Sequence, residues 1–510
     1  MKKLLIGLLA LTSTFGLFAC KKKTSTTKEK TTGHTTTKKP VETVETDNPS
    51  YVSNFEPQVS ETLPRIDINV DDNSFDFYTS VTSVDSNKPY AACKVTVKDG
   101  DTTTIDSVKA QVKVRGNYTV EYAKKPLRIK FDKKQSMLGL HDGDAYKNWV
   151  LLAEYKDWSM LRNATAFYLA HLMDGNYVSD FRLVNVYLNN QYYGVYLLAE
   201  QQEVKAGRID ITEADEANPE DTNIGYYLEY DGYYYKEPEN QQFTVKYPTM
   251  FDINNIPFNR YQTGYTIKND VYSSTQTTFI KNYIQGVFDI CYKAIVENKY
   301  YEFDSTYQTI SESTTIKSQH EAISKVLDID SLVNSYILAD IACDVDIAWS
   351  SFLLDVNFGE GGDKKVRFES PWDFDSSFGN TLGCLDGKGV YAGTVTKNVK
   401  NEDSANPWYL LFYKADWFKN LIKDKFNALK NNGSFTKVTT YITTMTTTFE
   451  ADFVANYAKW DNCGHPELYW IEFEKSDAGK CKTQKEASEC LVKWLNNRLE
   501  NLDKIYNETE

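Results

Sequence analysis

Two short acidic segments hold the residues of this chain whose types and spacing best suit chemistry. Asp344 and Asp346 follow an apolar stretch, and Asp373 and Asp375 alternate with aromatic residues further along the chain. Two predicted strands lie between these segments, so both segments should meet at one end of a hairpin. If Trp372–Asp375 is extended, its two carboxylates share one face. Such carboxylates suit a divalent metal ion on nucleotide phosphates, although a solvated turn with aromatic anchors fits the spacing as well.

Motifs for several other reaction classes are incomplete. Gly387-Lys388 lacks the upstream Gly and the following Ser or Thr of a phosphate-binding loop. The sequence contains neither a GxSxG elbow nor an HExxH zinc motif. Asp67, Asn69 and Asp71 begin like a calcium loop, but the Gly that such a loop requires is missing. A polysaccharide hydrolase would need a carboxylate pair across a groove, and the sequence does not place one.

The secondary structure that must position the acidic segments is predicted to be mostly strands in the first half of the chain and mostly helices in the second. The first half is predicted to hold strands and one helix at 161–172, for which Ser159 is the predicted N-cap. The strands are predicted at 66–68, 112–114, 126–131, 149–153, 184–188, 195–198 and 224–230, with a hairpin turn at Asn189-Asn190. The second half is predicted to hold helices at 274–298, 330–343, 417–431 and 486–506, and strands at 351–356 and 366–369. We therefore expect an α+β protein with a β-rich N-terminal lobe and a mainly helical C-terminal lobe.

The charge of the chain narrows the possible partners. Of its 57 basic and 71 acidic residues, nine Lys and four acidic residues fall within the first 50, which leaves the rest with a net charge of −19. This excess of negative charge argues against a general nucleic-acid binder. It is compatible with metal binding and with basic protein substrates.

Seven cysteines follow Cys20 at wide and irregular intervals, and an odd number cannot all pair. They are Cys93, Cys291, Cys343, Cys384, Cys463, Cys481 and Cys490. The absence of a CxxC pair argues against a structural zinc site. A bridge from Cys463 to Cys481 or Cys490 is one possibility that the sequence leaves open.

The first twenty residues have the pattern of an export signal. Two lysines precede the apolar stretch Leu4–Leu17, whose length suits a signal peptide better than a membrane span. Leu17–Cys20 resembles the lipobox of bacterial lipoproteins, in which the Cys is lipidated and the chain is cut before it, although Phe18 is larger than the usual residue. An ordinary secretory signal and an uncleaved anchor helix are the alternatives.

The lipobox resemblance predicts the organisation of the N-terminus and the location of the protein. We expect a signal peptide at 1–19, lipidation at Cys20 and a flexible tether at 20–58, where Lys and Thr dominate and too few apolar residues exist to form a core. The body would then lie outside the cytoplasm, anchored by lipid to a bacterial membrane or cell surface.

A series of motifs in the body resembles the spore coat protein H (CotH) family of atypical, kinase-like proteins. The motifs occur in the order of the family and span roughly residues 63 to 505. They are Lys113–Asn117, Lys124–Pro126 leading into RIKF, Trp149–Tyr155 with Asp157, Leu161–Asn163, Tyr187–Asn189, Gly194–Leu198 with Glu200, Asp346, and Trp372–Asp375 with Phe378-Gly379.

The resemblance implies a two-lobed fold distantly akin to protein kinases. The kinase-like domain would span 59–508, with an N-lobe at about 59–270 and a C-lobe at about 271–508. The implied cofactors are ATP and Mg²⁺ or Mn²⁺, and the implied acceptor is a Ser or Thr hydroxyl of a basic, Ser/Thr-rich surface or envelope protein.

The resemblance also implies a role for each matching residue. Asp346 would be the catalytic carboxylate and Asp373 the metal ligand, with Asp375 a second metal ligand or a loop cap. The phosphates would be contacted by one or more cations from the matching motifs, and Glu200 would orient one of these cations as an ion pair does in kinases. The cations are Arg115, Lys125 and Arg162, of which Lys125 is the expected partner of Glu200.

One position departs from the kinase pattern, and two classes of function follow. Kinase catalytic loops carry Asn five residues after the catalytic Asp, whereas this chain carries Ser351 there, so Asp344 or Asp375 would have to substitute as a metal ligand. ATP is also scarce outside the cytoplasm. The chain is therefore either a surface-displayed kinase or a catalytically inactive surface module, an adhesin or an envelope organiser. Retention of four charged residues together favours the kinase, because a scaffold needs no charges in a cleft; these are Asp346, Asp373, Arg115 and Glu200.

Overall fold

The structure is a computed structural model that describes residues 53–71, 89–116, 118–175, 177–259, 261–384, 386–398, 402–468 and 476–507. All of these residues belong to one unit, Ser50–Glu510. The predicted signal peptide, Cys20 and most of the predicted tether lie outside the described residues. Those predictions therefore stay predictions.

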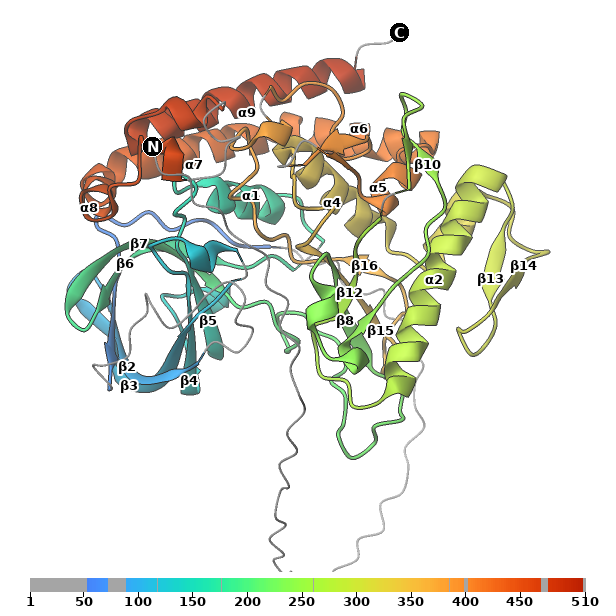
Figure 1. The fold of residues 1–510 in the computed structure, drawn as a ribbon, viewed down its shortest axis with the longest axis horizontal. Coiled ribbons are helices and arrows are strands. Elements are labelled where there is room, and N and C mark those ends of the chain that lie inside the picture. Colours follow the sequence, from blue (N-terminus) through green and yellow to red (C-terminus); the bar gives the residue numbers. More distant parts are fainter. Residues whose placement is uncertain are drawn as a thin grey trace, which may run out of the picture. The chain divides into compact units, whose positions relative to one another are not determined.

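The first seven strands close into a barrel, drawn in blue to green in Figure 1. In β2 the side chains of Ala91, Cys93, Val95 and Val97 are buried and alternate with more exposed ones, which is the pattern of a strand with one face on a core. The strands are β1 Arg65–Val70, β2 Ala91–Asp99, β3 Thr102–Val114, β4 Leu127–Gln135, β5 Tyr146–Leu152, β6 Phe181–Leu188 and β7 Gln191–Glu200. Their order is β1-β2-β3-β4-β5-β7-β6, and parallel pairing of β1 with β6 completes the closure.

Two local predictions can be compared directly with the barrel and its helix. The hairpin between β6 and β7 turns at Asn189-Asn190 as predicted, and both residues have positive φ, as a tight hairpin turn requires. The helix α1 (Arg162–His171) also forms, but Ser159 is not its N-cap. Instead, a carboxylate oxygen of Asp157 accepts hydrogen bonds from the backbone N–H groups of Leu161 and Arg162.

A second, five-stranded sheet has the order β16-β15-β8-β12-β9. Its strands are β8 Gly225–Asp231, β9 Gln242–Phe243, β12 Gly264–Ile267, β15 Phe352–Asn357 and β16 Arg367–Phe368. The sheet therefore joins strands from both sides of residue 270, where the boundary between the two lobes was predicted. The helix α2 (Ser274–Glu297) lies beside this sheet in Figure 1 and contributes buried residues to the same core.

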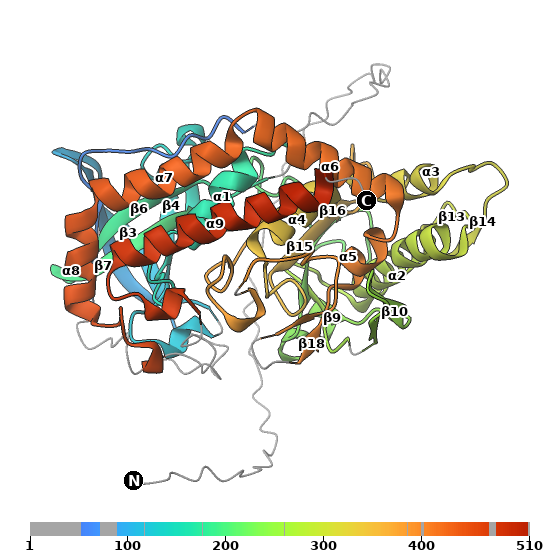
Figure 2. The ribbon, with the colours of Figure 1, turned by 90° about the horizontal axis from the view of Figure 1, so that it is seen from above.

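Helices cover the remaining side of the core, and several of them pack together in Figure 2. The further helices are α3 Gln319–Ser324, α4 Ile329–Ala342, α5 Pro407–Phe412, α6 Asp416–Asn431, α7 Ser434–Thr448, α8 Glu450–Trp460 and α9 Gln484–Asn507. The long helices α7 and α9 lie side by side, and α1 and α4 lie beneath them. A buried ion pair between Arg498 of α9 and Asp340 of α4 fixes this packing.

The fold class is α+β, as predicted, and the closed barrel is a feature that the sequence did not predict. Three short hairpins complete the described structure: β10 Met250–Phe251 with β11 Pro257–Phe258, β13 Tyr301–Phe303 with β14 Ile310–Glu312, and β17 Thr396–Lys397 with β18 Asp403–Ser404. None of the helices in the described ranges has the length and apolar character that a membrane span needs.

Candidate functional site

The first acidic segment is a tight turn at the end of α4. Cys343 adopts a left-handed conformation with φ 46°, which ends the helix, and the N–H of Asp344 still bonds the carbonyl of Ala339 at 3.0 Å. The carbonyl of Asp346 then accepts hydrogen bonds from the N–H groups of Trp349 and Ser350 at 2.7 and 2.8 Å. This turn leaves the carboxylate of Asp346 half-buried at the edge of the protein core.

The second acidic segment follows β16 and docks against the first. The N–H of Phe378 donates to the carbonyl of Ala342, the last residue of α4, at 2.7 Å. The hydroxyl of Ser377 lies 3.3 Å from a carboxylate oxygen of Asp344, which also accepts the N–H of Asp346 at 3.1 Å. The two segments therefore meet at one end of the β15–β16 pair, as the sequence predicted.

The backbone of the second segment differs from the extended form that was considered. Asp373 has φ 66°, in the left-handed region that a non-glycine residue adopts only at a cost. Trp372 stacks on Phe167 of α1 with ring centroids 5.5 Å apart, and the N–H of Phe374 donates to the side-chain oxygen of Asn163 at 2.7 Å. Trp372 and Phe374 thus anchor the segment on α1, and the backbone makes a left-handed turn at Asp373 between them.

The pKa of three carboxylates in the two segments, those of Asp344, Asp346 and Asp373, is raised by burial and by neighbouring negative charge. Burial, followed by the charge of Asp344, raises the pKa of Asp346 to about 7. Burial and the neighbouring charges of Asp375 and Asp346 raise the pKa of Asp373 well above its usual range. Burial likewise raises the pKa of Asp344 to about 7, and the charge of Asp373 adds to the effect. The site therefore carries more negative charge than its surroundings neutralise.

Two cations of the described residues face this cluster, and the sequence predicted one of them. Arg115, which follows β3, has its guanidinium 5.4 Å from the ring centroid of Trp372, and its charge lowers the pKa of Asp373. Lys156, which the sequence did not predict, bonds the hydroxyl of Ser376 and lowers the pKa of both Asp346 and Asp373. Its position beside Asp157, within a recognised motif, was the available signal.

Arg162 occupies the layer behind the cluster and is fully engaged with protein groups. Its guanidinium pairs with the carboxylate of Asp157, and both groups are buried. It also donates to the carbonyl of Ser377 at 3.1 Å and to that of Phe378 at 3.5 Å. Its donors hold the segment that follows Asp375 in this arrangement, and the expected phosphate contact of Arg162 stays a prediction.

The predicted ion pair between Lys125 and Glu200 does not form, so this prediction is wrong. The ammonium of Lys125 donates to the carbonyl of Val120. The carboxylate of Glu200 instead pairs with Arg208 at 3.0 Å and with His141 at 3.1 Å, and all three side chains are largely buried. Both Lys125 and Glu200 thus serve the packing of the barrel, and the structure does not bring them to the acidic cluster.

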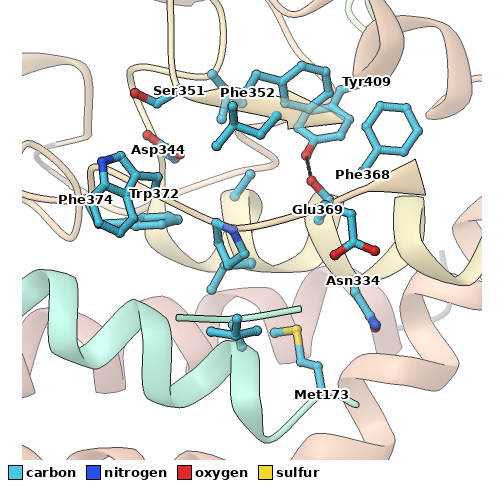
Figure 3. A pocket seen from close by; sticks show the side chains of 18 residues that line it. Met173, Asn334, Asp344, Ser351, Phe352, Phe368, Glu369, Trp372, Phe374 and Tyr409 are labelled. Atoms are coloured by element: carbon cyan, nitrogen blue, oxygen red, sulfur yellow. Dashed lines mark hydrogen bonds between the residues drawn. The ribbon is translucent and has the colours of Figure 1, made fainter. Parts of the chain in front are cut away.

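A pocket adjoins the cluster, with an empty volume of about 540 Å³ that is partly open to solvent. Its walls come from α1, α4, β15, β16 and the two acidic segments. Figure 3 shows Asp344 and Ser351 at the end near Trp372, whereas Glu369 and Asn334 lie at the opposite end. Only about 40 Å³ of this space admits a water-sized sphere, which is room for a few water molecules, so the pocket in this arrangement is a narrow hollow beside the cluster.

The cluster suits a metal ion that arrives with phosphate ligands. Among the described residues, no group of three or more His, Cys, Asp or Glu side chains is arranged to hold a metal ion on its own. Mg²⁺ commonly uses one or two carboxylates together with phosphate oxygens and waters. The mutual repulsion of Asp346, Asp373 and Asp375 is the kind of unfavourable charge that a divalent cation would relieve, so these residues fit the group.

Comparison with known proteins identifies one family. A family model described as CotH kinase protein matches residues 112–502, which is most of the chain. A search among curated proteins finds no match. The matched range includes Arg115, Lys156 and both acidic segments.

Proposed function

Because this chain belongs to the CotH kinase protein family, we propose that it is an atypical protein kinase that transfers the γ-phosphate of ATP to Ser or Thr hydroxyls. The observation that carries this proposal is the convergence of Asp346, Asp373 and Asp375 with Arg115 and Lys156 from distant parts of the chain. Phosphoryl transfer needs little covalent chemistry from a protein. It needs carboxylates, a metal ion and cations that are held in place around the phosphates.

Each residue of the cluster has a role in this proposal. Asp346 accepts a hydrogen bond from the acceptor hydroxyl and takes its proton, and a pKa near neutral suits a general base. Asp373 and Asp375 hold Mg²⁺ or Mn²⁺, which when bound neutralises charge on the phosphates. Arg115 and Lys156 attract the phosphates from the other side of the cluster.

The proposal includes the two-lobed arrangement of a kinase. Arg115 and Lys156 follow the barrel strands β3 and β5, whereas the carboxylates follow α4 and β16. We propose that the barrel takes the place of the N-lobe and that the helices take the place of the C-lobe, with the reaction between them. The five-stranded sheet, which joins residues from both sides of position 270, then forms part of the platform beneath the site.

We also propose that the protein works outside the cytoplasm, tethered to a membrane through a lipid on Cys20. The support is the apolar stretch Leu4–Leu17 followed by Leu17–Cys20, together with the Lys/Thr-rich segment beyond it. The proposed acceptors are basic, Ser/Thr-rich surface or envelope proteins, because the body carries excess negative charge.

The second candidate is a catalytically inactive surface module of the same family. Ser351 favours it, because this residue stands where kinases place a metal-binding Asn. The N–H of Ser351 donates to a carboxylate oxygen of Glu229 at 3.0 Å, and Ser351 has φ 60°, so its backbone is constrained. In the kinase pattern, a Ser hydroxyl at this constrained position replaces the stronger ligand Asn. A site with one weakened ligand could retain the fold without the reaction.

The two candidates differ in whether purified protein transfers phosphate. We expect wild type to label a basic, Ser-rich protein from γ-labelled ATP with Mg²⁺ or Mn²⁺. Asp346→Asn should lower the rate by about 10²–10⁴-fold, the usual contribution of a general base. Asp424→Asn, at an exposed position of α6, is the matched control and should transfer as wild type does. Equal labelling by wild type and Asp346→Asn would reject the kinase and favour the inactive module.

A further inference from the structure

Three cysteines of the C-terminal part lie in one small apolar cluster. Cys481 follows a short helical turn, Ala478–Lys480, and is buried, whereas Cys490 lies in the second turn of α9 and is half-buried. Both pack with Cys463 around Trp158. The thiol of Cys481 donates to the carbonyl of Asp477 at 3.5 Å, and the thiols of Cys481 and Cys490 are close enough to shift each other's pKa.

Four other cysteines of the described residues lie in other clusters of the core. Cys343 donates to the carbonyl of Asp340 at 3.8 Å, and Cys384 donates to the carbonyl of Thr381 at 3.4 Å. Cys93 lies inside the barrel, and Cys291 lies in the buried face of α2. Each of these four thiols is buried, so a solution oxidant reaches them poorly.

Cys490 has the features of an attacking thiol. Its side chain keeps contact with solvent, and its interaction with the neighbouring Cys481 side chain lowers the pKa of Cys490. The nearby positive charges of Arg162 and Lys493 act in the same direction. The thiolate is the reactive form of cysteine, so Cys490 should react before its buried partner.

We propose that Cys481 and Cys490 form a disulfide in an oxidising environment, with Cys463 left as a thiol. The oxidant is a disulfide, either of a small molecule or of a thiol oxidoreductase. The Cys490 thiolate attacks one of its sulfurs, forms a mixed disulfide and releases the first thiol. Cys481 loses its proton and attacks the Cys490 sulfur, which forms the bond and releases the second thiol. Two electrons and two protons thereby pass from the cysteines to the oxidant.

The bond would stabilise the start of α9 against the segment behind the acidic cluster. Gln484, between the two cysteines, donates from its side chain to the carbonyl of Ser159 at 2.8 Å, and Ala487 packs in the cluster with Trp158. A link from Cys481 to Cys490 restrains the unfolded chain as well, which adds to stability. The proposal depends on chemistry and packing, and in vitro it does not depend on kinase activity or on export.

Peptide mapping without reduction shows which cysteines are paired. The full chain is purified with reductant, exposed to oxidised glutathione, blocked with an alkylating reagent and cut with trypsin without reduction. Trypsin cuts after Lys480, Lys482, Lys485 and Lys493, so Cys481 and Cys490 fall on separate peptides. We expect the Cys481 peptide linked to the Cys490 peptide in wild type and in Cys463→Ser. A link from Cys463 to either residue, or alkylation of both Cys481 and Cys490 after oxidation, would overturn the proposal.

Thermal unfolding provides an independent measurement on the same samples. Oxidised wild type should unfold a few degrees above the reduced form, and Cys463→Ser should show the same difference. Cys481→Ser and Cys490→Ser should lose the difference, because neither can form the bond. Cys490→Ser covers the case in which substitution of buried Cys481 prevents folding. An oxidation shift that survives in Cys490→Ser would contradict the assignment.

Discussion

At the scale of single residues, the site is a set of carboxylates that repel one another. Burial and mutual repulsion raise the pKa of Asp344, Asp346 and Asp373 above that of an ordinary Asp. Catalytic groups often have such perturbed pKa values, although structural clusters can have them too. A divalent cation would lower these pKa values. The repulsion among the carboxylates without metal is therefore consistent with a site for metal and phosphate.

The raised pKa of Asp346 predicts a dependence of stability on pH. The pKa is 3.8 in an ordinary Asp and about 7 in the folded protein, so between these values the folded state holds the proton more tightly than the unfolded state. Stability from this group is therefore present at low pH and is lost as pH rises towards 7. Asp346→Asn removes the loss, so in chelator its Tm should approach that of wild type below about pH 3.8 and exceed it by a few degrees at pH 8.

The control for this prediction is an Asp that the fold leaves in solvent. Asp424→Asn, on the exposed side of α6, should follow the wild-type Tm at every pH. If the Tm values of wild type and Asp346→Asn change with pH in parallel from acid to pH 8, Asp346 does not carry the unfavourable charge.

At the scale of elements, the segment after β16 depends on its supports from α1. Arg162 bonds the carbonyls of Ser377 and Phe378, and Asn163 bonds the N–H of Phe374 and the carboxylate of Glu154. These contacts hold the left-handed turn that contains Asp373. The first turn of α1 therefore acts as a rigid base for the segment that is proposed to bind metal, which is what a preorganised site requires.

The buried pair of Arg162 and Asp157 predicts a large loss of stability when it is broken. Arg162→Met leaves the carboxylate of Asp157 buried without its cation and should cost about 3–5 kcal/mol in the free energy of unfolding, measured with urea. Asp157→Asn should also destabilise, and the double variant should cost less than the sum of the two.

An exposed pair on α6 provides the comparison. Lys419 and Asp416 form a pair at 3.2 Å on the surface, so Lys419→Met should cost less than about 1 kcal/mol. A cost for Arg162→Met as small as that for Lys419→Met would show that Arg162 does not support the segment.

Elements with strong local patterns were predictable, and those that depend on distant contacts were not. The helices α2, α4, α6 and α9 lie within two residues of their predicted ends, because their apolar residues repeat at helical spacing. The helix α7 was missed, because its many Thr residues disfavour a helix and its burial against α1 and α9 decides the outcome.

The candidate site shows the same limit. The acidic segments could be paired from the sequence, because only a hairpin separates them. The position of Lys156 in the site could not be predicted, because its partner Ser376 lies 220 residues away in the sequence. The ion pair expected between Lys125 and Glu200 failed because motif matching does not reveal which side chains a fold buries.

At the scale of the whole molecule, the proposed tether determines what the site can meet. The predicted lipid on Cys20 and the segment up to residue 58 would hold an acidic body close to a membrane, among envelope proteins. A basic acceptor protein would be attracted by that negative charge, while ATP is scarce outside the cytoplasm. The proposed location would therefore limit the proposed reaction through the supply of ATP.

Cys20→Ser tests the tether. The wild-type chain, expressed in a bacterial host, should incorporate labelled fatty acid and sediment with membranes. Cys20→Ser should lose the label and appear in the soluble extracytoplasmic fraction. Cys93→Ser, inside the barrel, is a control that should retain the label. A Cys20→Ser protein that remains with membranes would indicate an uncleaved anchor helix instead.

The central claim is that the acidic cluster binds a metal ion together with ATP, and Mn²⁺ binding followed by electron paramagnetic resonance tests it most directly. Compared with the same Mn²⁺ and ATP without protein, wild type should give the additional loss of signal that Mn²⁺ and ATP bound together to the protein produce, as should Asp424→Asn. Asp373→Asn should weaken that binding by about tenfold or more, because loss of a direct ligand costs at least as much as loss of its support. Equal binding of Mn²⁺ and ATP by wild type and Asp373→Asn would contradict the account.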